Sequence, residues 1–371
     1  MAEPLAKQFG AAAIQTRGTG TVDERRNHRP SIQASAVTEN HDYITNRISQ
    51  ENCRSAFLPE VHSTTAELKI SPQALLGGTR VTSILVCGSL AFDDIGFFDQ
   101  RLTADIRNVK LTRLYRTFGG CAINIAYNLK HLGDDPLPFV TVGDDYAPEY
   151  QAHLTRLAIS QRGIRIVPDA LSSRGIVLTD NEGAQFTAFY PGPPVPDDHA
   201  QELEKLKTEF DFEAAVIAPD VPEKMLTAAN QLAQIPIRLW CPGQYAELLD
   251  RRQVETLVTF ANLLIVNAHE WQTLCQQCDE LELRSAVDTL LVTDGPNPIT
   301  LYYPLRCKQV HTQVQVPTIP PERQVDPTGC GDAFAAAYLH YQLAGEPPTS
   351  AAELATERAA ACMAQRGCQN H

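Results

Sequence analysis

The stretch VDPTGCGDAF, residues 325–334, combines residue types that suit phosphate chemistry. Gly329 and Gly331 flank Cys330, Asp332 follows directly, and the next residues are mostly small and apolar, as in a buried helix. Glycines ahead of a helix let several backbone N–H groups point at one spot, and the helix start adds unpaired donors and the positive end of its dipole. The stretch therefore predicts an anion site that suits a phosphate group.

A carboxylate beside such an anion site is suited to act as a base. Asp332 could take a proton from a hydroxyl group while neighbouring N–H groups stabilise the charge on a phosphoryl group in transfer. The alternative is that Asp332 only caps the helix. The stretch is not a Walker A loop, because no Gly-Lys-Ser/Thr follows the glycines.

Apolar strands alternate with helices through the later part of the chain. Each strand is a nearly continuous apolar run that ends in a polar or glycine tip, as in VTSILVCGSL and TLLVTDG. This pattern predicts an α/β fold with three layers, in which helices cover both faces of a mostly parallel sheet. Ligands of such folds bind beyond the carboxyl ends of the strands. The expected strands are 81–90, 136–145, 214–220, 262–270 and 289–295, and the expected helices are 124–133, 223–234 and 245–258.

Two segments, about 92–118 and 174–190, interrupt this alternation. They contain short runs of Thr, Val, Phe and Tyr, and Asn181-Glu182-Gly183 lies within the second segment like a hairpin turn. We interpret the two segments as a small antiparallel β flap that forms a lid beside the main sheet.

The overall composition argues against several functional classes. The chain has 371 residues and a formal net charge of −13, whereas general nucleic-acid binding requires a basic surface. No apolar run approaches the length of a membrane span. Ten cysteines are scattered along the chain, and Cys275 and Cys278 form the only close pair. A lone pair of this kind is weak evidence for zinc and favours reduced thiols in a cytoplasmic protein.

Residues 1–80 differ from the rest of the chain. They are rich in Ala, Ser, Thr, Asn, Gln and Arg and show no sustained hydrophobic period. The start has no apolar signal-peptide core. We expect residues 1–80 to be a disordered extension and residues 81–371 to form the folded domain.

Three motifs together resemble the ribokinase-like (PfkB) carbohydrate and nucleoside kinases. DPTGCGDAF resembles the second family signature, and FGGCAINIAYNLKHLG, residues 118–133, resembles the first. Asn267-Ala-His-Glu270 matches a third element, Asn-x-x-Glu at a strand tip. The motifs follow the family order, and the resemblance covers residues 81–371 and is strongest to bacterial adenosine or nucleoside kinases. It implies the three-layer ribokinase-like α/β/α fold with a small β lid.

The resemblance assigns the reacting groups. It implies that Asp332 is the base that activates the acceptor hydroxyl. It also implies that Gly329, Cys330 and Gly331 form the anion hole through their backbone N–H groups. Asp326 opens the same signature, and we expect it to hold the loop at which the nucleotide binds.

The resemblance also assigns the sugar of the acceptor to Asp93, Gly119, Gly120 and Asn124. A carboxylate such as Asp93 can accept two hydrogen bonds from a ribose diol. From the residues alone, Asp93 and Asp94 could instead form a solvated turn, and the two glycines could be a packing turn.

Magnesium and the nucleotide phosphates are assigned to two further strand tips. By resemblance, Asn267 and Glu270 organise Mg²⁺ and its waters, and Thr293 and Gly295 lie on the loop that approaches the phosphates of ATP. One carboxylate together with substrate oxygens suits a hard cation that stays partly hydrated. From the residues alone, Asn267 and Glu270 could instead cap the helix that follows.

Five positions depart from the family pattern. Ile123 occupies a place where the family has a small residue, Cys241 replaces a carboxylate, and Tyr190 replaces a histidine. Pro296 and Pro298 interrupt a stretch that is usually rich in glycine, and each lacks an N–H that could meet a phosphate oxygen. We therefore expect weak binding of ATP by an enzyme whose base and anion hole are intact.

These observations and the resemblance together predict an ATP- and Mg²⁺-dependent kinase. Its expected acceptor is the 5′-hydroxyl of a ribonucleoside such as adenosine, which would be a step of purine salvage. Two alternatives stay open: a sugar kinase that acts on ribose, fructose or a relative, and a nucleoside- or nucleotide-binding protein without useful turnover. The base preference and the oligomeric state, monomer or homodimer, are also open.

Deletion of residues 1–80 tests the predicted boundary. Because these residues show no core-forming pattern, a chain that starts at Val81 should keep nearly the same melting temperature and kinase activity. Thermal denaturation and a turnover assay on both forms check this. A large loss of either property would place the extension within the fold.

Overall fold

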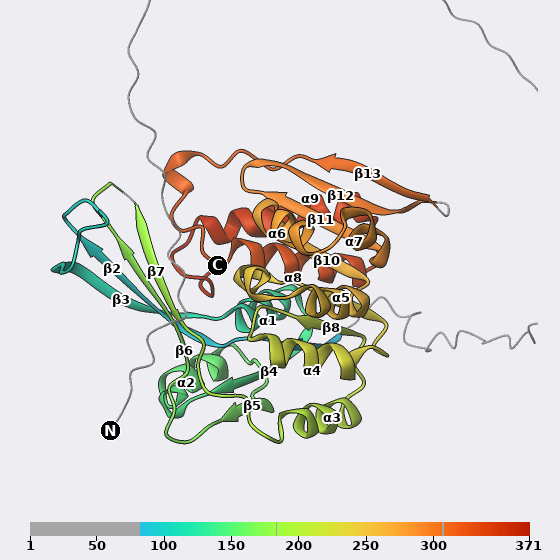
Figure 1. The fold of residues 1–371 in the computed structure, drawn as a ribbon, viewed down its shortest axis with the longest axis horizontal. Helices are drawn as coiled ribbons and strands as arrows, with labels where there is room; N and C mark the ends of the chain where they lie inside the picture. The colour runs from blue at the N-terminus through green and yellow to red at the C-terminus, as the bar shows by residue number, and fades with distance from the viewer. Residues whose placement is uncertain (1–81, 183, 306–307) are drawn as a thin grey trace, which may run out of the picture. The chain divides into compact units, whose positions relative to one another are not determined.

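The computed structural model describes residues 82–371 except 183 and 306–307 (Figure 1). The expectation for residues 1–80 lies outside the described residues. So do Val81, at the start of the first expected strand, and Gly183 of the expected hairpin turn.

A nine-stranded sheet forms the centre of the described part of the chain, in the order β13-β12-β11-β10-β9-β8-β1-β4-β5 (Figure 1). Neighbouring strands are parallel from β11 through β5, whereas β12 and β13 are antiparallel. The mostly parallel sheet predicted from the apolar runs is therefore confirmed. Its strands are β1 (Ser83–Cys87), β4 (Asp135–Val142), β5 (Gly163–Ile166), β8 (Ala214–Ile217), β9 (Ile237–Trp240), β10 (Leu263–Asn267), β11 (Thr289–Asp294), β12 (Asn297–Leu305) and β13 (Lys308–Val314).

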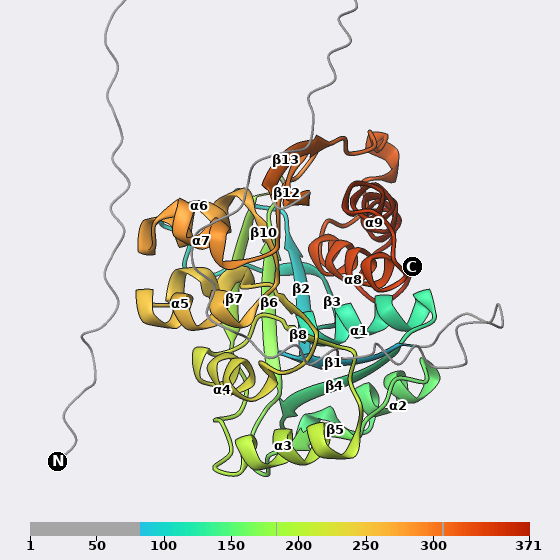
Figure 2. The same ribbon diagram turned by 90° about the vertical axis from the view of Figure 1, so that its right-hand side faces the viewer.

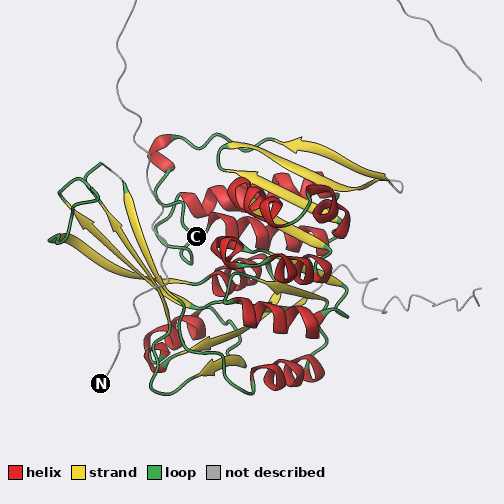
Figure 3. Cartoon of the chain, viewed as in Figure 1, coloured by secondary structure: helices red, strands yellow, loops and turns green. Residues whose placement is uncertain are grey.

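Helices cover both faces of this sheet because its strands are apolar on both sides. In β1, Ile84 and Val86 pack into one core, and Leu85 and Cys87 pack into the other. Helices α1, α2, α8 and α9 lie over the first core and α3 to α7 over the second (Figures 2 and 3). No helix among the described residues has the length and hydropathy needed to cross a membrane. The helices are α1 (Cys121–Leu132), α2 (Glu149–Arg156), α3 (His199–Glu209), α4 (Pro222–Leu232), α5 (Arg251–Phe260), α6 (Ala268–Gln277), α7 (Glu280–Ala286), α8 (Cys330–Leu343) and α9 (Pro348–Met363).

The helix expected over 245–258 is two separate elements. A short 3₁₀ helix covers Gly243–Leu248, and α5 begins only at Arg251. The break is set by Asp250, whose carboxylate accepts a hydrogen bond from the N–H of Gln253, while the Gln253 side chain accepts one from the N–H of Asp250. This reciprocal capping box starts a new helix at that point.

The lid is a second sheet of four strands in the order β3-β2-β6-β7, and it extends away from the main body (Figure 1). The expectation of a purely antiparallel flap is wrong, because the central pair, β2 and β6, is parallel. Both strands follow parallel strands of the main sheet, β1 and β5, so both leave the same edge in the same direction. The strands are β2 (Ala91–Phe98), β3 (Leu111–Gly119), β6 (Ser173–Thr179) and β7 (Gln185–Tyr190).

The lid joins the main sheet at the edge where ligands bind in folds of this class. Strand β2 begins shortly after β1 ends, so the lid starts at the carboxyl ends of the parallel strands. Asn267 ends β10 and Asp294 ends β11 at the same edge, because β10 and β11 are parallel neighbours. The polar strand tips singled out in the sequence therefore face the lid.

Candidate active site

The start of α8 has the geometry of an anion site. Gly329 is its N-cap with φ of 80°, in the left-handed region, and a Cβ there would lie 2.7 Å from the Cβ of Cys368. The N–H of Cys330 is used by the preceding turn, since it donates to the carbonyl of Pro327 at 3.2 Å. The first-turn N–H groups that remain without a partner inside the helix are those of Gly331 and Asp332. A Cβ at Gly331 would meet nothing within 4 Å, so the space in front of these donors is open.

Asp326 holds the loop that precedes this helix. One carboxylate oxygen accepts a hydrogen bond from the N–H of Thr328 at 3.0 Å, and the other accepts one from the N–H of Gly367 at 3.1 Å. The backbone N–H groups of Val325 and Asp326 both donate to the carbonyl of Met363 at the end of α9. The loop is therefore fixed to the segment that follows α9.

Asp332 lies in the first turn of α8 and is partly accessible from a cavity. The side-chain amide of Asn124 on α1 donates a hydrogen bond to its Oδ2 at 2.8 Å. Burial raises the pKa of Asp332 to about 7, the charges of Glu270 and Asp93 act in the same direction, and hydrogen bonds from Asn124 and Cys121 oppose them. A carboxyl group with such a pKa is suited to exchange protons near neutral pH.

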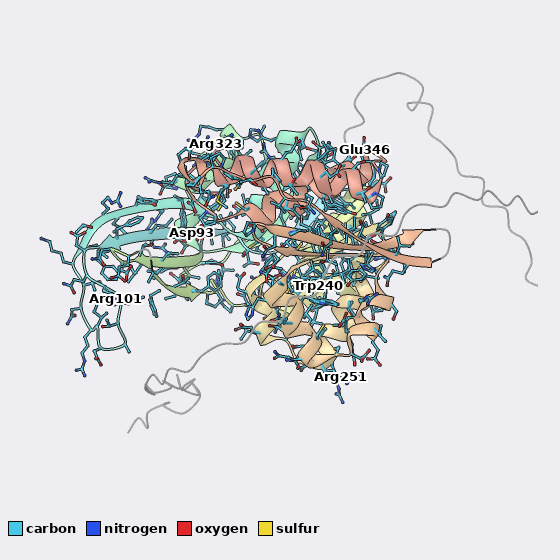
Figure 4. All side chains as sticks on the ribbon, turned by 90° about the horizontal axis from the view of Figure 1, so that it is seen from above. Asp93, Arg101, Trp240, Arg251, Arg323 and Glu346 are labelled. Atoms are coloured by element: carbon cyan, nitrogen blue, oxygen red, sulfur yellow. The ribbon has the colours of Figure 1, made fainter. Side chains whose placement is uncertain are left out.

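Asp93 lies on β2 at the base of the lid (Figure 4). Its carboxylate occupies space that two glycines leave free. A Cβ at Gly119 would lie 2.1 Å from its Oδ2, and a Cβ at Gly175 would lie 2.6 Å from its Oδ1. Burial, followed by the charges of Asp326 and Asp94, raises the pKa of Asp93 to about 6.

Asp93 and Asp94 belong to a strand and do not form a solvated turn. Their side chains alternate across the lid sheet, as in any strand. Asp94 pairs with Arg116 at 2.8 Å and with Arg174 at 3.3 Å. Gly120, the N-cap of α1, has φ of 90°, and a Cβ there would lie 2.5 to 2.7 Å from the backbone of residues 89–91. The turn before α1 therefore requires glycine.

Asn267 and Glu270 form the capping box of α6. The N–H of Glu270 donates to Asn267 Oδ1 at 2.8 Å, and the N–H of Asn267 donates to Glu270 Oε2 at 3.0 Å. The helix-capping alternative is thus correct as a description of their contacts. Both residues also line the cavity in front of Asp332. Burial raises the pKa of Glu270, and the N–H of Asn267 and the charge of His269 oppose this shift.

Two adjoining cavities meet at the start of α8. The first, of about 500 Å³, contains Asp332, Asn267 and Glu270. The second, of about 410 Å³, has a largely apolar wall. Thr293, Gly331 and Phe334 line both, so the two cavities adjoin at the open space in front of the helix. Further lining residues of the second cavity are Gly295, Pro296, Ile299, Val316, Ile319, Ala359 and Met363.

The two prolines of the expected nucleotide loop lie in different places. Gly295, with φ of 55°, and Pro296 form the tight turn between β11 and β12, and both line the second cavity. Pro298 lies within β12 and is not part of that turn. Cys241 lines the first cavity, and Tyr190 ends β7 on the lid.

Sequence reasoning missed the partners that hold Asn124. Its Oδ1 accepts a hydrogen bond from the side chain of Gln369 at 2.9 Å, and Gln369 also contacts Tyr150 and His153. All four side chains are buried. Gln369 lies in the segment RGCQNH, residues 366–371, which has no periodic or turn pattern that would single it out.

Comparisons with known proteins identify the family of the chain. Residues 81–371 match the family described as pfkB family carbohydrate kinase. A nucleoside kinase of Methanocaldococcus jannaschii is 24% identical over 299 residues, which are 79% of this chain and 94% of the relative.

Solved structures show the same fold. The nucleoside kinase of Burkholderia thailandensis, solved in complex with inosine, is 31% identical and has a TM-score of 0.68, and the match covers 78% of this chain and 92% of that chain. Ribokinase from Thermotoga maritima is 19% identical with a TM-score of 0.63, covering 78% of this chain and 95% of that chain. The chain belongs to the pfkB family of carbohydrate kinases and is a phosphotransferase with an alcohol group as acceptor.

Proposed function

We propose that the enzyme transfers the γ-phosphoryl group of ATP to the 5′-hydroxyl of a ribonucleoside such as adenosine, and that residues 81–371 are its kinase domain. The observation that carries the proposal is the position of Asp332, which lies at the start of α8, next to N–H groups without a partner inside the helix and in the cavity that Asn267 and Glu270 also line. The named relatives support a nucleoside as acceptor. Two of them are nucleoside kinases, and one was solved with inosine, a purine nucleoside.

In the proposed reaction, Asp332 accepts the proton of the acceptor hydroxyl. Because its pKa is raised to about 7, a large fraction is ionised near neutral pH and the carboxylate is still basic enough to take a proton. The N–H groups of Gly331 and Asp332 and the dipole of α8 stabilise the charge on the phosphoryl group as it moves. Gly329 and Cys330 contribute by shaping the turn that exposes these donors.

The proposed sugar site lies where the lid meets the main body. Asp93 would accept hydrogen bonds from the ribose diol, Gly119 leaves the room that its carboxylate occupies, and Gly120 permits the turn that begins α1 beside it. One N–H of the Asn124 amide is bound to Asp332, and the second would bind a sugar oxygen. The same residue would then position both the base and the substrate.

The donor set in the first cavity fits a magnesium ion that keeps most of its waters. Glu270 offers one carboxylate and Asn267 an amide oxygen, and within the described residues no group of three or more His, Cys, Asp or Glu side chains could cage an ion. Magnesium sites of phosphotransferases commonly combine one or two carboxylates with water and phosphate oxygens. When bound, the ion would neutralise charge on the phosphates.

The second cavity suits the nucleotide. Thr293 lies at its boundary with the first cavity, where the phosphates of ATP would enter, Gly295 lines the second cavity itself, and the apolar wall would take the adenine ring. Asp326 does not line either cavity, and its carboxylate is bound to two backbone N–H groups. We propose that Asp326 shapes the loop before α8 without touching the nucleotide.

A turnover screen with ATP and Mg²⁺ tests the proposed acceptor. Purine and pyrimidine ribonucleosides, ribose and fructose are offered separately, and the phosphorylated product is identified by mass spectrometry. Turnover of ribonucleosides with the phosphate on the 5′-oxygen supports the proposal. Turnover of free sugars alone would establish the sugar-kinase alternative, and binding of nucleoside without any turnover would establish the binding protein.

Replacement of the proposed base tests its role. Asp332→Asn should lower kcat by about 10²–10⁴-fold, the usual contribution of a general base, with little change in nucleoside binding. The wild-type kcat should fall as the pH drops below about 7, because protonated Asp332 cannot accept a proton. Asp135→Asn, at an exposed carboxylate paired with Lys130, is the control and should change neither property. Near-normal turnover of Asp332→Asn would contradict the assignment.

The same variant should be more stable than the wild type at pH 8. Burial raises the pKa of Asp332 from 3.8 to about 7. At pH values above the pKa of the unfolded chain, ionisation of Asp332 therefore destabilises the folded state relative to the unfolded state. The difference in melting temperature should be largest at pH 8 and should disappear as the pH falls towards 4. Melting curves at several pH values measure it, and a lower melting temperature of Asp332→Asn at pH 8 would contradict the inferred burial cost.

A methyl group beside Asp93 tests the sugar site. Gly175→Ala places a Cβ 2.6 Å from Asp93 Oδ1, which must move the carboxylate. Loss of one hydrogen bond to a charged group, about 1.5–3 kcal/mol, should raise the KM for nucleoside roughly tenfold or more while the KM for ATP stays constant. Gly96→Ala is the matched control, because its Cβ would meet only the flexible ends of Leu178 and Leu111. Equal effects of the two variants would argue against Asp93 as the sugar ligand.

The turn proline tests the nucleotide site. Pro296 lacks the N–H that could meet a phosphate oxygen, so we expect a high KM for ATP in the natural enzyme. Pro296→Gly should lower that KM roughly tenfold with kcat similar, since one such bond contributes about 1.5–3 kcal/mol. Pro298→Gly, within β12, should leave the KM for ATP unchanged. Tight ATP binding by the natural enzyme would show that the turn does not contact the phosphates.

A further inference from the structure

A chain of hydrogen bonds runs through the protein from α2 to the base. Arg156 Nη2 contacts His153 Nδ1 at 3.3 Å, and His153 Nε2 contacts Gln369 Oε1 at 2.9 Å. Gln369 Nε2 then donates to Asn124 Oδ1 at 2.9 Å, and Asn124 Nδ2 donates to Asp332 Oδ2 at 2.8 Å. The three middle members, His153, Gln369 and Asn124, are 6%, 3% and 4% exposed, so water does not compete for these contacts.

The chemistry at the two ends fixes the direction of every bond in this chain. An ionised carboxylate only accepts hydrogen bonds, so Asn124 must turn its NH₂ group to Asp332 and its oxygen to Gln369. Gln369 must then present its own NH₂ group to Asn124 and its oxygen to His153. At the other end, the guanidinium of Arg156 only donates, so His153 accepts at Nδ1 and carries its proton on Nε2. Both ends therefore demand the same orientation of the Gln369 amide.

We propose that Gln369 is a positioning residue for the reaction: it locks the Asn124 amide in the orientation that donates a hydrogen bond to Asp332. The inference rests on the proposed role of Asp332 as the base. Gln369 does not touch the reacting groups and acts through Asn124, which lies 245 positions away in the sequence.

The surroundings of Gln369 hold its side chain in place. Its Nε2 also donates to the hydroxyl of Tyr150 at 3.0 Å, and that hydroxyl donates to the carbonyl of Gly119 at 2.7 Å. The segment 366–371 is fixed on both sides of Gln369. The N–H of Gly367 donates to Asp326, and the carbonyl of His371 accepts from the hydroxyl of Tyr127 at 2.5 Å. The Gln369 amide is therefore held between β3, through Tyr150 and the carbonyl of Gly119, and Asp332, through Asn124.

Without the donor at position 369, only the ionised Asp332 carboxylate still favours this orientation of the Asn124 amide, and the opposite orientation becomes accessible. Rotation by half a turn would place Asn124 Oδ1 against Asp332, and two acceptors face each other favourably only if the carboxyl group is protonated. The base would then hold its proton to a higher pH. His153 stays neutral in this arrangement, because burial lowers its pKa and Arg156 acts in the same direction, while the hydrogen bond to Gln369 opposes the shift.

Other ionisable groups also face Asp332, and a substitution at Gln369 leaves them in place. The carboxylates of Glu270 and Asp93 raise the pKa of Asp332, and the thiol of Cys121 lowers it through a hydrogen bond. A shift produced by a variant of Gln369 is thus attributable to Asn124. The further thiols whose charge would interact with Asp332 are those of Cys241, Cys330, Cys362 and Cys368.

The test is the pH dependence of kcat in the full-length enzyme with saturating ATP, Mg²⁺ and the nucleoside found in the turnover screen. Gln369→Met keeps the length of the side chain but cannot donate to Asn124. The acid limb of the profile should move upward by about one pH unit, so kcat is about tenfold lower at pH 6 and nearly normal at pH 9. Gln369→Glu keeps the shape and, when ionised, offers only acceptors, so its acid limb should move in the same direction.

Two variants control for loosened packing. Gln161→Met makes the same substitution at a glutamine that hydrogen-bonds Tyr146 and Thr155 outside this chain of bonds. Asn370→Ala changes the neighbour of Gln369, whose side chain bonds only locally to the carbonyl of Arg366. Both should leave the acid limb where it is. If Gln369→Met lowers kcat equally at all pH values, or leaves the profile unchanged, Gln369 has only a structural role and the proposal is overturned.

A spectroscopic titration separates this inference from the proposed function. The carboxyl ¹³C resonance of Asp332, identified by its loss in Asp332→Asn, is followed with pH in the wild type and in Gln369→Met. An upward shift in the variant supports the positioning role even if Asp332→Asn still turns over, in which case the assignment of the base fails by itself. An unshifted titration together with an inactive Asp332→Asn would overturn the inference and leave the proposed function standing.

Discussion

The hydrogen bond between Asn124 and Asp332 is the interaction on which the rest of the candidate site depends. It joins the first helix of the domain, α1, to the helix that carries the candidate base, α8, across 208 positions of sequence. A carboxylate at the start of a buried helix loses hydration, and this loss raises its pKa. Hydrogen bonds from the Asn124 amide and from the Cys121 thiol oppose this rise without neutralising the carboxylate. The candidate anion site, the candidate sugar site and the segment 366–371 all adjoin this contact.

Close approach of backbone and carboxylate explains where the glycines lie. Gly329 leaves room for Cys368, and Gly119 and Gly175 leave room for Asp93 between two neighbouring lid strands. Any side chain at these places would collide with atoms that the site requires. Gly331 differs, because a Cβ there would meet nothing within 4 Å and the space in front of the helix, the proposed phosphate site, stays open. The glycines thus belong to the site as much as the carboxylates do.

Several residues serve the fold and the proposed chemistry together. Asn267 and Glu270 cap α6 and also line the cavity in front of the base. Asp326 joins the loop before α8 to the segment after α9 by accepting hydrogen bonds from the N–H groups of Thr328 and Gly367, and its charge raises the pKa of Asp93. A contact that stabilises a helix end or a turn also fixes a side chain with low conformational entropy, which is what a precise site requires. The capping and functional interpretations of such residues are therefore compatible.

The sequence by itself determined the structural features that depend on residues close together in the chain. Apolar runs with glycine or polar tips predicted the parallel strands, and the glycines around Cys330 predicted the start of α8 and the position of Asp332. Local patterns could not decide how distant segments meet. The parallel pairing of β2 with β6 follows from the edge that both strands leave. The restart of the helix at Arg251, by contrast, follows from a local capping box between Asp250 and Gln253 that sequence reasoning overlooked. The contact of Gln369 with Asn124 was also decided only by the tertiary structure, because a hydrogen bond across 245 positions leaves no periodic or compositional signal in the chain.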